Sequence, residues 1–319
     1  PHLDVLRRQA RPLLRALIAG DPAALARAAP FALGNRPQLS GAQLVIAREH
    51  GFASWPRLVA EVDRRQAAAL ADHAFVDQVL TLALGRGFEA PQPARAMALI
   101  HSRPLDSLPL ALVGGDLAAV QRALAGADLH APIGPFAASP IVHVAFSSLA
   151  RLDDVRPRLL ATLRWLLDQG ADANATLRDP ADPDAALPLL YGAVARARCF
   201  DAVEMLLQAG AEPNDNESLY HATEQSDRRM LDALVAAGAR WAGTNAMLRQ
   251  LDQDDLANLR QVLDLGADPN ERGPGGRPAL HHALLRGRSV DFVQLLLERG
   301  ANPSVRDDDG HSAAWHAAR

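Results

Sequence analysis

The side chains best suited to chemistry recur at one position of several short, similar segments. When these segments are aligned by their helix starts, one column contains mainly polar residues where leucine would suffice: Leu112, His143, Tyr191, His221, Arg249, His282 and His316. Imidazole, phenol and guanidinium groups donate hydrogen bonds, and imidazole and guanidinium can carry positive charge. The column indicates either a polar recognition surface or first-helix residues that hydrogen-bond the nearby backbone.

A metal centre is a third use for such histidines, and the spacing argues against it. Stacked helices lie about 8 to 10 Å apart, whereas each histidine on a zinc ion must bring a nitrogen to about 2.0 to 2.1 Å. The acidic turn Asp307, Asp308 and Asp309 lacks the spacing of a calcium-binding loop, so we expect solvated turn residues there. We predict no metal site and no cofactor.

Motifs for catalysis are missing from the sequence. There is no G-x-S-x-G, no H-E-x-x-H and no Rossmann fingerprint, and GPGGRP at 273–278 lacks the strand before it and the Lys after it that a phosphate loop requires. Cys199 has Arg196 and Arg198 nearby, which could lower its pKa, but no assured histidine or acidic partner, so we expect a packing cysteine. We name no catalytic residues, although an enzyme is not excluded.

Composition favours a packed, helical protein. The 319 residues are 49% hydrophobic and 22% charged, with 63 Ala, 5 Ile and 4% aromatic residues, and Ala and Leu are good helix formers. A net charge of -4 argues against nucleic-acid binding. The sequence contains no run of 18 apolar residues, so we predict no membrane span. One cysteine fits a reducing cytoplasm. All 33 basic residues are Arg, which we attribute to GC-rich coding in a bacterium.

Charge is distributed unevenly along the chain. Residues 1–65 contain 10 Arg and 5 acidic residues, a net charge of +5, so the remaining residues sum to -9. Two ordinary solvated surfaces would explain this. The alternative is that the charge steers a partner or that the basic head contacts the acidic body of another copy.

One phrase, an apolar helix tail followed by Gly-Ala, recurs along the chain. Its glycines are Gly126, Gly170, Gly210, Gly238, Gly266 and Gly300. Consecutive glycines are separated by 44, 40, 28, 28 and 34 residues. A helix often ends on a left-handed glycine, and the leucines before it supply the buried face. A second phrase, such as PALHHAL at 278–284, opens a short helix before each tail. The pattern predicts stacked helix pairs.

These phrases resemble the ankyrin repeat, with its Thr-Pro-Leu-His helix start and its Leu-Leu-Leu, Gly-Ala-Asp helix end. The best copy spans 275–310, and Pro278 and Trp315 stand where Thr and His are expected. The resemblance covers residues 108–319, about six repeats and part of a seventh. It implies an all-α solenoid in which His281 has a structural hydrogen-bonding role.

Two further parts precede the repeats. Residues 1–66 are expected to form a helical leader or cap, and the stretch 39–62 is similar to a leader of bacterial ankyrin-repeat proteins. Residues 67–107 are expected to be a helical linker or degenerate repeat. At the other end, the chain stops inside a helix with Trp315 unburied, so we expect the natural protein to continue beyond Arg319 or to pack these residues against a partner.

The resemblance implies non-catalytic binding of a protein partner through the concave groove that the polar column borders. The predicted contact residues, with one possible aromatic anchor last, are His143, Tyr191, His221, Arg249, His282 and Trp241. One alternative is an enzyme or small-molecule binder with a pocket near the insertions 147–162 and 175–188, the second of which carries Asp179, Asp182 and Asp184. The other is a structural homo-oligomer.

Overall fold

The computed structural model describes residues 3–31, 36–87, 89–179, 182–225 and 227–318, with only the backbone at 179 and 182–185, and is mainly helical. Within these ranges, no helix is long and apolar enough to cross a membrane. The chain divides into two compact units, Pro1–Val79 with Ala94–Asp106, and Leu80–Pro93 with Ser107–Arg319. The predicted boundaries after residues 66 and 107 remain predictions.

The first unit consists of amphipathic helices around an aliphatic core. Its helices are α1 (Leu3–Ile18), α2 (Pro22–Ala28), α3 (Leu39–Glu49) and α4 (Trp55–Ala68), together with the first part of α5 (Asp72–Leu84) and most of α6 (Pro93–Ser102). Helix α1 packs on α3 and α4 through buried side chains such as Leu6 and Ile46. The guanidinium of Arg95 makes two 2.7 Å hydrogen bonds to the buried carboxylate of Asp63, which ties α6 to α4.

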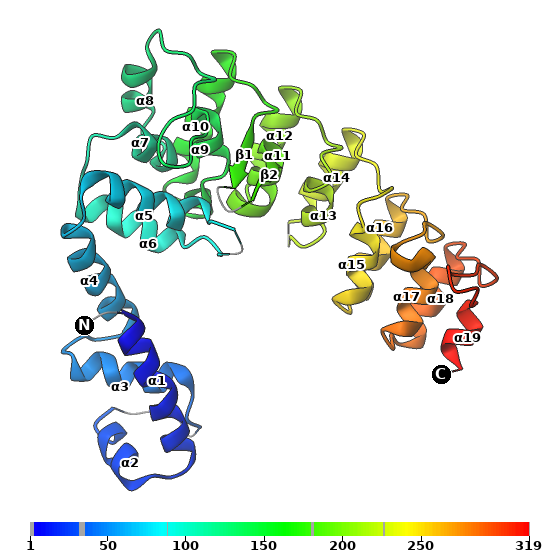
Figure 1. Cartoon of the computed structure of the whole chain (residues 1–319), viewed down its shortest axis with the longest axis horizontal. Coiled ribbons are helices and arrows are strands. Elements are labelled where there is room, and N and C mark those ends of the chain that lie inside the picture. Colours follow the sequence, from blue (N-terminus) through cyan, green and yellow to red (C-terminus); the bar gives the residue numbers. More distant parts are fainter. Residues whose placement is uncertain (1–2, 32–35, 88, 180–181, 226, 319) are drawn as a thin grey trace. The chain divides into compact units, whose positions relative to one another are not determined.

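The second unit contains six consecutive helix pairs in its described residues (Figure 1). The first helices of the pairs are α7 (Leu108–Gly114), α9 (Pro140–Ala145), α11 (Leu189–Tyr191) continued by the π-helix η2 (Gly192–Ala197), α13 (Ser218–Ala222), α15 (Ala246–Asp252) and α17 (Ala279–Leu285). The second helices are α8 (Leu117–Leu124), α10 (Arg156–Asp168), α12 (Phe200–Gln208), α14 (Arg229–Ala236), α16 (Leu256–Asp264) and α18 (Val290–Glu298). Helix α19 (Ala313–Ala317) follows as a further first helix, and η1 (Ser148–Arg151) and η3 (Pro274–Gly276) are short 3₁₀ turns.

Helices of one kind pack against each other. First helices contact first helices, as α13 contacts α15, α15 contacts α17 and α17 contacts α19, and second helices follow the same rule, as α10 contacts α12. This stacking confirms the predicted array of helix pairs. Side chains at equivalent positions of consecutive first helices are therefore neighbours in space, although they are far apart in the sequence.

The recurring Gly-Ala ends the second helix as the sequence predicts. Gly170 has a φ of +89°, its N–H donates to the Leu167 carbonyl at 2.9 Å, and the N–H of Ala171 donates to the Leu166 carbonyl at 3.0 Å. This pair of bonds is a Schellman motif, which satisfies the last carbonyls of the helix. A side chain at this φ is strained, so glycine is favoured at the position.

In three segments, an asparagine four residues after the glycine of Gly-Ala connects one repeat to the next. Asn270 donates from Nδ2 to the Gly300 carbonyl at 2.9 Å and accepts from the Asn302 N–H at 2.7 Å. Asn174 and Asn214 bridge to Gly210 and Gly238 in the same way. These side chains satisfy backbone groups that a helix end leaves unpaired.

The two insertions have defined structure in the described residues. Residues 147–150 are buried, with hydrogen bonds from the Ser147 hydroxyl to the Val113 carbonyl at 2.8 Å and from the Ser148 hydroxyl to the Ala83 carbonyl at 2.6 Å. Part of that insertion is thus core, because its polar groups find backbone partners. The second insertion forms an antiparallel hairpin of β1 (Thr176–Asp179) and β2 (Asp182–Pro188), with Leu177 opposite Leu187. The predicted charges of Asp179, Asp182 and Asp184 lie outside the side chains that the structure describes.

Candidate functional site

Four consecutive first helices carry a connected series of polar side chains, which we call the polar row. It passes from α11 through α13 and α15 to α17 and consists of Tyr191, His221, Glu224, Arg249, Asp252 and His282. Four of these residues belong to the predicted contact column. The stacking of the first helices brings them together.

His221, on α13, lies between two carboxylates. Its Nδ1 is 3.0 Å from Oε2 of Glu224, and its Nε2 is 3.5 Å from Oε2 of Glu217. Burial works to lower the pKa of His221, but the hydrogen bonds and charges of these two carboxylates outweigh it, and the pKa is raised. The side chain is 25% exposed, so an imidazolium here could contact a partner.

Glu224 also joins α13 to α15, and Asp252 then joins α15 to α17. Arg249 donates from Nε to Oε1 of Glu224 at 2.9 Å. Oδ1 of Asp252 lies 2.9 Å from Nε2 of His282 and 2.8 Å from Nε of Arg286. Burial works to raise the pKa of Asp252, but the hydrogen bond from His282 and the surrounding positive charges lower it overall.

The two acidic residues that connect the row were missed in the sequence analysis. Glu224 and Asp252 each follow a column residue, His221 and Arg249, by three positions. Residues three apart lie on the same helix face. An acidic residue at this spacing in two consecutive segments therefore indicates, from the sequence, that it can pair with the column residues. The column alone shows only which side chains repeat, not which of them pair.

His143 lies in the core, which corrects its assignment as a surface contact residue. It has 0% exposed surface, its Nδ1 donates to the Ser139 carbonyl at 3.2 Å, and its Nε2 is buried with no hydrogen-bond partner among the residues that the structure describes. Burial lowers the pKa of His143 to about 4, so the ring is neutral at pH 7. It offers no surface to a partner.

Tyr191 is also mostly buried, with 7% of its surface exposed. Its ring makes an edge contact with His221 at a centroid distance of 5.0 Å and a tilted contact with Phe146 at 6.1 Å, and the guanidinium of Arg196 lies 5.8 Å from its centroid. Burial raises its pKa. Tyr191 therefore packs against His221 as a buried side chain and does not form an exposed contact.

Trp241, the predicted aromatic anchor, is half-buried and connects two repeats. The segment after Gly238 has Ala242 where other segments have asparagine, and the indole of Trp241 instead donates to the Leu265 carbonyl at 3.1 Å. The ring borders a cavity of about 50 Å³ that also includes Glu271 and Arg272. The hydrogen bond to Leu265 gives Trp241 a structural role.

A small cavity lies beside the hairpin, near where the enzyme alternative places a pocket. It has a volume of about 10 Å³, which is room for about one water molecule, and its lining includes Arg86, Phe136, Leu177 and Arg196. A cavity of this size does not hold a substrate. Cys199, which precedes α12, is buried, and burial raises the pKa of its thiol, which fits the predicted packing role.

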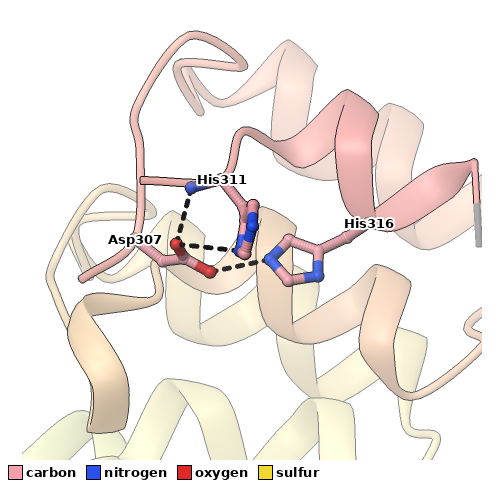
Figure 2. A group of neighbouring side chains, drawn as sticks. All are labelled: Asp307, His311 and His316. Carbon is pink, nitrogen blue, oxygen red and sulfur yellow. Dashed lines mark hydrogen bonds and ion pairs between the residues drawn. The ribbon is translucent and has the colours of Figure 1, made fainter. Parts of the chain in front are cut away.

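A second polar cluster lies in the last repeat, where two imidazole rings face one carboxylate (Figure 2). Nε2 of His316 is 2.8 Å from Oδ2 of Asp307, and Nδ1 of His311 is 3.8 Å from Oδ1 of the same residue. Oδ1 also accepts backbone N–H groups from Asp309 at 3.1 Å and His311 at 2.8 Å. Asp307 opens the turn 307–310, His311 follows that turn directly, and His316 lies on α19, so these adjoining segments position all three side chains.

The burial of Asp307 corrects its assignment as a solvated turn residue, whereas Asp308 and Asp309 are exposed as expected. Burial works to raise the pKa of Asp307, but the His311 amide and the side chains of His316 and Arg277 lower it overall. Nε of Arg277 is 3.5 Å from Oδ2 of Asp307.

Two neighbours complete the cluster. The Trp315 ring stacks on His311 at a centroid distance of 3.5 Å and an angle of 10°. His281 is buried, and its Nε2 donates to the His311 carbonyl at 3.2 Å, which confirms its predicted structural role. Within the described part of the chain, its Nδ1 is buried without a hydrogen-bond partner, and Pro278, which stands where Thr is expected, has no hydroxyl to offer.

Comparison with known families identifies the repeats. A family described as "Ankyrin repeats (many copies)" matches residues 252–297, which include α16, α17 and most of α18. The crystal structure of the ankyrin repeat domain of Bcl-3, a member of the IkappaB protein family, aligns with 66% of this chain and 92% of its own, at a TM-score of 0.54 and 20% identity. The chain therefore contains ankyrin repeats, and its helix pairs have the ankyrin-repeat fold.

Relatives match only segments of the chain. The ADP-ribosylation factor GTPase-activating protein AGD4 of Arabidopsis thaliana is 45% identical over 63 residues, 20% of this chain and 8% of the relative. A protein of Treponema pallidum (strain Nichols) described as ankyrin repeat-containing is 31% identical over 129 residues, 37% of this chain and 43% of the relative. The chain thus spans less than half the length of these relatives, which come from a plant and a bacterium.

Proposed function

We propose that this chain binds a protein partner through the polar row on its first helices. The observation that carries the proposal is the sharing of Glu224 and Asp252 between neighbouring helices, which holds His221, Arg249 and His282 in fixed positions while leaving them partly exposed. Side chains held in this way lose little conformational entropy on binding. Ankyrin repeats, as stacked and pre-ordered units, provide the extended rigid surface that such recognition uses.

Three of the six contact residues that the sequence predicts remain in the contact set, and three acidic side chains join them. His221 and Arg249 are offered as positive contacts and His282 as a polar one, with Glu217, Glu224 and Asp252 as negative contacts beside them. His143, Tyr191 and Trp241 serve as structural support. This mixture suits a polar partner surface of alternating charge, so the complex should weaken as salt screens its exposed charges.

The test is site-specific photo-crosslinking from two arginines of the same helix pair. A photoreactive residue replaces either Arg249 on α15, in the polar row, or the exposed Arg260 on α16, on the second helix. In the native host, we expect a discrete crosslinked protein from position 249 and none of that size from position 260. The purified partner is then titrated against R249A, H282A and R260A, of which only the first two should bind at least tenfold more weakly.

Equal binding by all three folded variants contradicts the proposal, as does a partner crosslinked only from Arg260. The bacterial source, the cytoplasmic location and the lack of nucleic-acid binding remain predictions from composition. Self-association of the basic residues 1–65 with the acidic remainder also remains a prediction. Light scattering over a salt series tests it, and a monomer at every ionic strength rejects it.

A further inference from the structure

We infer that Asp307, His311 and His316 form a binding site for a divalent transition-metal ion of the zinc type, with a carboxylate oxygen, Nδ1 of His311 and Nε2 of His316 as ligands. The inference is independent of the proposed partner binding, because it concerns the last repeat rather than the polar row. It also departs from the absence of a metal site that the sequence predicts.

The geometry of the donor atoms carries the inference. One ligand atom from each of the three residues lies within 4.8 Å of the others. Bond lengths of about 2.0 to 2.1 Å in a tetrahedral zinc site place ligand atoms roughly 3.4 Å apart. Nε2 of His316 is 2.8 Å from Oδ2 of Asp307, and Nδ1 of His311 is 3.8 Å from Oδ1 of the same carboxylate. These two distances lie on either side of that value. Small rotations of the side chains therefore suffice to bind an ion.

The type of donor selects the type of metal. Two imidazoles and one carboxylate suit zinc and its neighbours among the transition metals, whereas calcium and magnesium prefer oxygen ligands. Three protein ligands leave a fourth position open for water or another group. The His311 side chain is 32% exposed, and those of Asp307 and His316 are 0% and 4% exposed. An ion would therefore reach the site from the His311 side.

The surroundings hold the ligands in place before an ion arrives. Trp315 stacks on the His311 ring, two backbone amides hold Oδ1 of Asp307, and His281 holds the carbonyl of His311. Contacts of this kind orient ligands in known metal sites and affect their affinity. The sequence alignment missed the site because it placed His316 in the column of the first helices, away from Asp307.

Two features oppose binding, and both can be accommodated. The Nε2–H group of His316 donates a hydrogen bond to Oδ2 of Asp307, so metal binding requires that proton to leave or the ring to carry its proton on Nδ1. The positive charge of Arg277 lies near Oδ2 of Asp307, but Nη2 of Arg277 is also 3.3 Å from Oδ2 of Asp309. Asp309 can therefore retain the guanidinium when an ion binds Asp307.

The test measures zinc binding to the full 319-residue chain, purified without a histidine tag and stripped of metal with a chelator. Isothermal titration with Zn²⁺ compares the wild type with H311A, H316A, the double variant and H130A, a matched control at an exposed histidine outside the cluster. We expect one zinc per chain in the wild type and H130A. Loss of either ligand should lower affinity on the order of 10- to 100-fold or more.

Cobalt absorption keeps the inference falsifiable if H316A does not fold. Co²⁺ added to the wild type should give an intense visible band of tetrahedral type, and H311A, which alters the most exposed ligand, should lose it with an unchanged circular dichroism spectrum. The site is rejected if the wild type binds no zinc, if the folded double variant binds it as tightly as the wild type, or if Ca²⁺ or Mg²⁺ competes equally.

Discussion

Nε of Arg249 lies 2.9 Å from Oε1 of Glu224, and the same carboxylate group receives Nδ1 of His221 through its other oxygen. This single acid therefore connects α13 to α15 and holds two predicted contact residues. Removal of this carboxylate should therefore change the electrostatics around His221 and the position of Arg249 in the binding surface.

We expect Glu224→Gln to lower the pKa of His221 and to reduce stability by about 0.5 to 1 kcal/mol. Because the pKa of His221 is raised in the folded state, its contribution to stability is fully present below the unfolded value of about 6.5 and is lost as pH rises through the folded pKa. The loss caused by the substitution should therefore be larger at pH 6 than at pH 9. NMR titration of the His221 ring and urea unfolding measure the two effects. Glu204→Gln, at an exposed position on α12, is the control, and an unchanged His221 titration in E224Q would contradict the assignment.

His143 should make the protein sensitive to acid in the opposite direction. Its pKa is lowered to about 4 by burial, so the unfolded chain binds the proton first, and stability should fall by up to roughly 3 kcal/mol as pH drops from about 6.5 towards 4. We expect His143→Leu to reduce this acid-dependent loss and to remove a buried, unpartnered nitrogen. Urea midpoints from pH 7.5 to 4.5 check this, with the exposed His130→Ala as control. Equal slopes in wild type and H143L would show that His143 does not cause the effect.

The indole of Trp241 should contribute to stability through one hydrogen bond. Trp241→Phe keeps a large apolar ring but removes the donor to the Leu265 carbonyl, so we expect a loss of about 0.5 to 1.5 kcal/mol in the free energy of unfolding. Trp165→Phe is the matched control, because no hydrogen bond from its indole is described. Chemical denaturation with a far-UV readout measures both variants, and a smaller loss for W241F than for W165F would contradict the structural role.

Gly300 should tolerate alanine poorly, whereas Gly114 should accept it. Gly300 has a φ of +89° at the end of α18, where alanine costs about 1 to 2 kcal/mol. Gly114 is helical in α7, and no atom of the described residues lies within 4 Å of an added Cβ, so alanine there should be neutral or stabilising by up to about 1 kcal/mol. Thermal unfolding of the two variants measures the difference. Similar melting temperatures would indicate that the left-handed cap contributes little.

The repeat architecture could be predicted because its signals are local. The preference for glycine after an apolar helix end depends only on the conformation of that turn, and Gly170 forms the predicted cap. The burial of Ser147 and Ser148 could not be predicted, because their hydroxyls pair with the Val113 and Ala83 carbonyls, which are distant in sequence. Polar residues in an insertion look like a surface loop until such partners are known.

The sequence by itself determined the helix pairs, their end caps and the column of polar residues on the first helices. Only the tertiary structure decided which members of that column are exposed and which acids they contact. His143 and His282 occupy equivalent positions, yet one is fully buried and the other pairs with Asp252 near the surface. His316 belongs to the same column but lies against Asp307. The physical reason is that burial and pairing depend on the neighbouring repeat and on the length of each turn, and alignment of single segments contains neither.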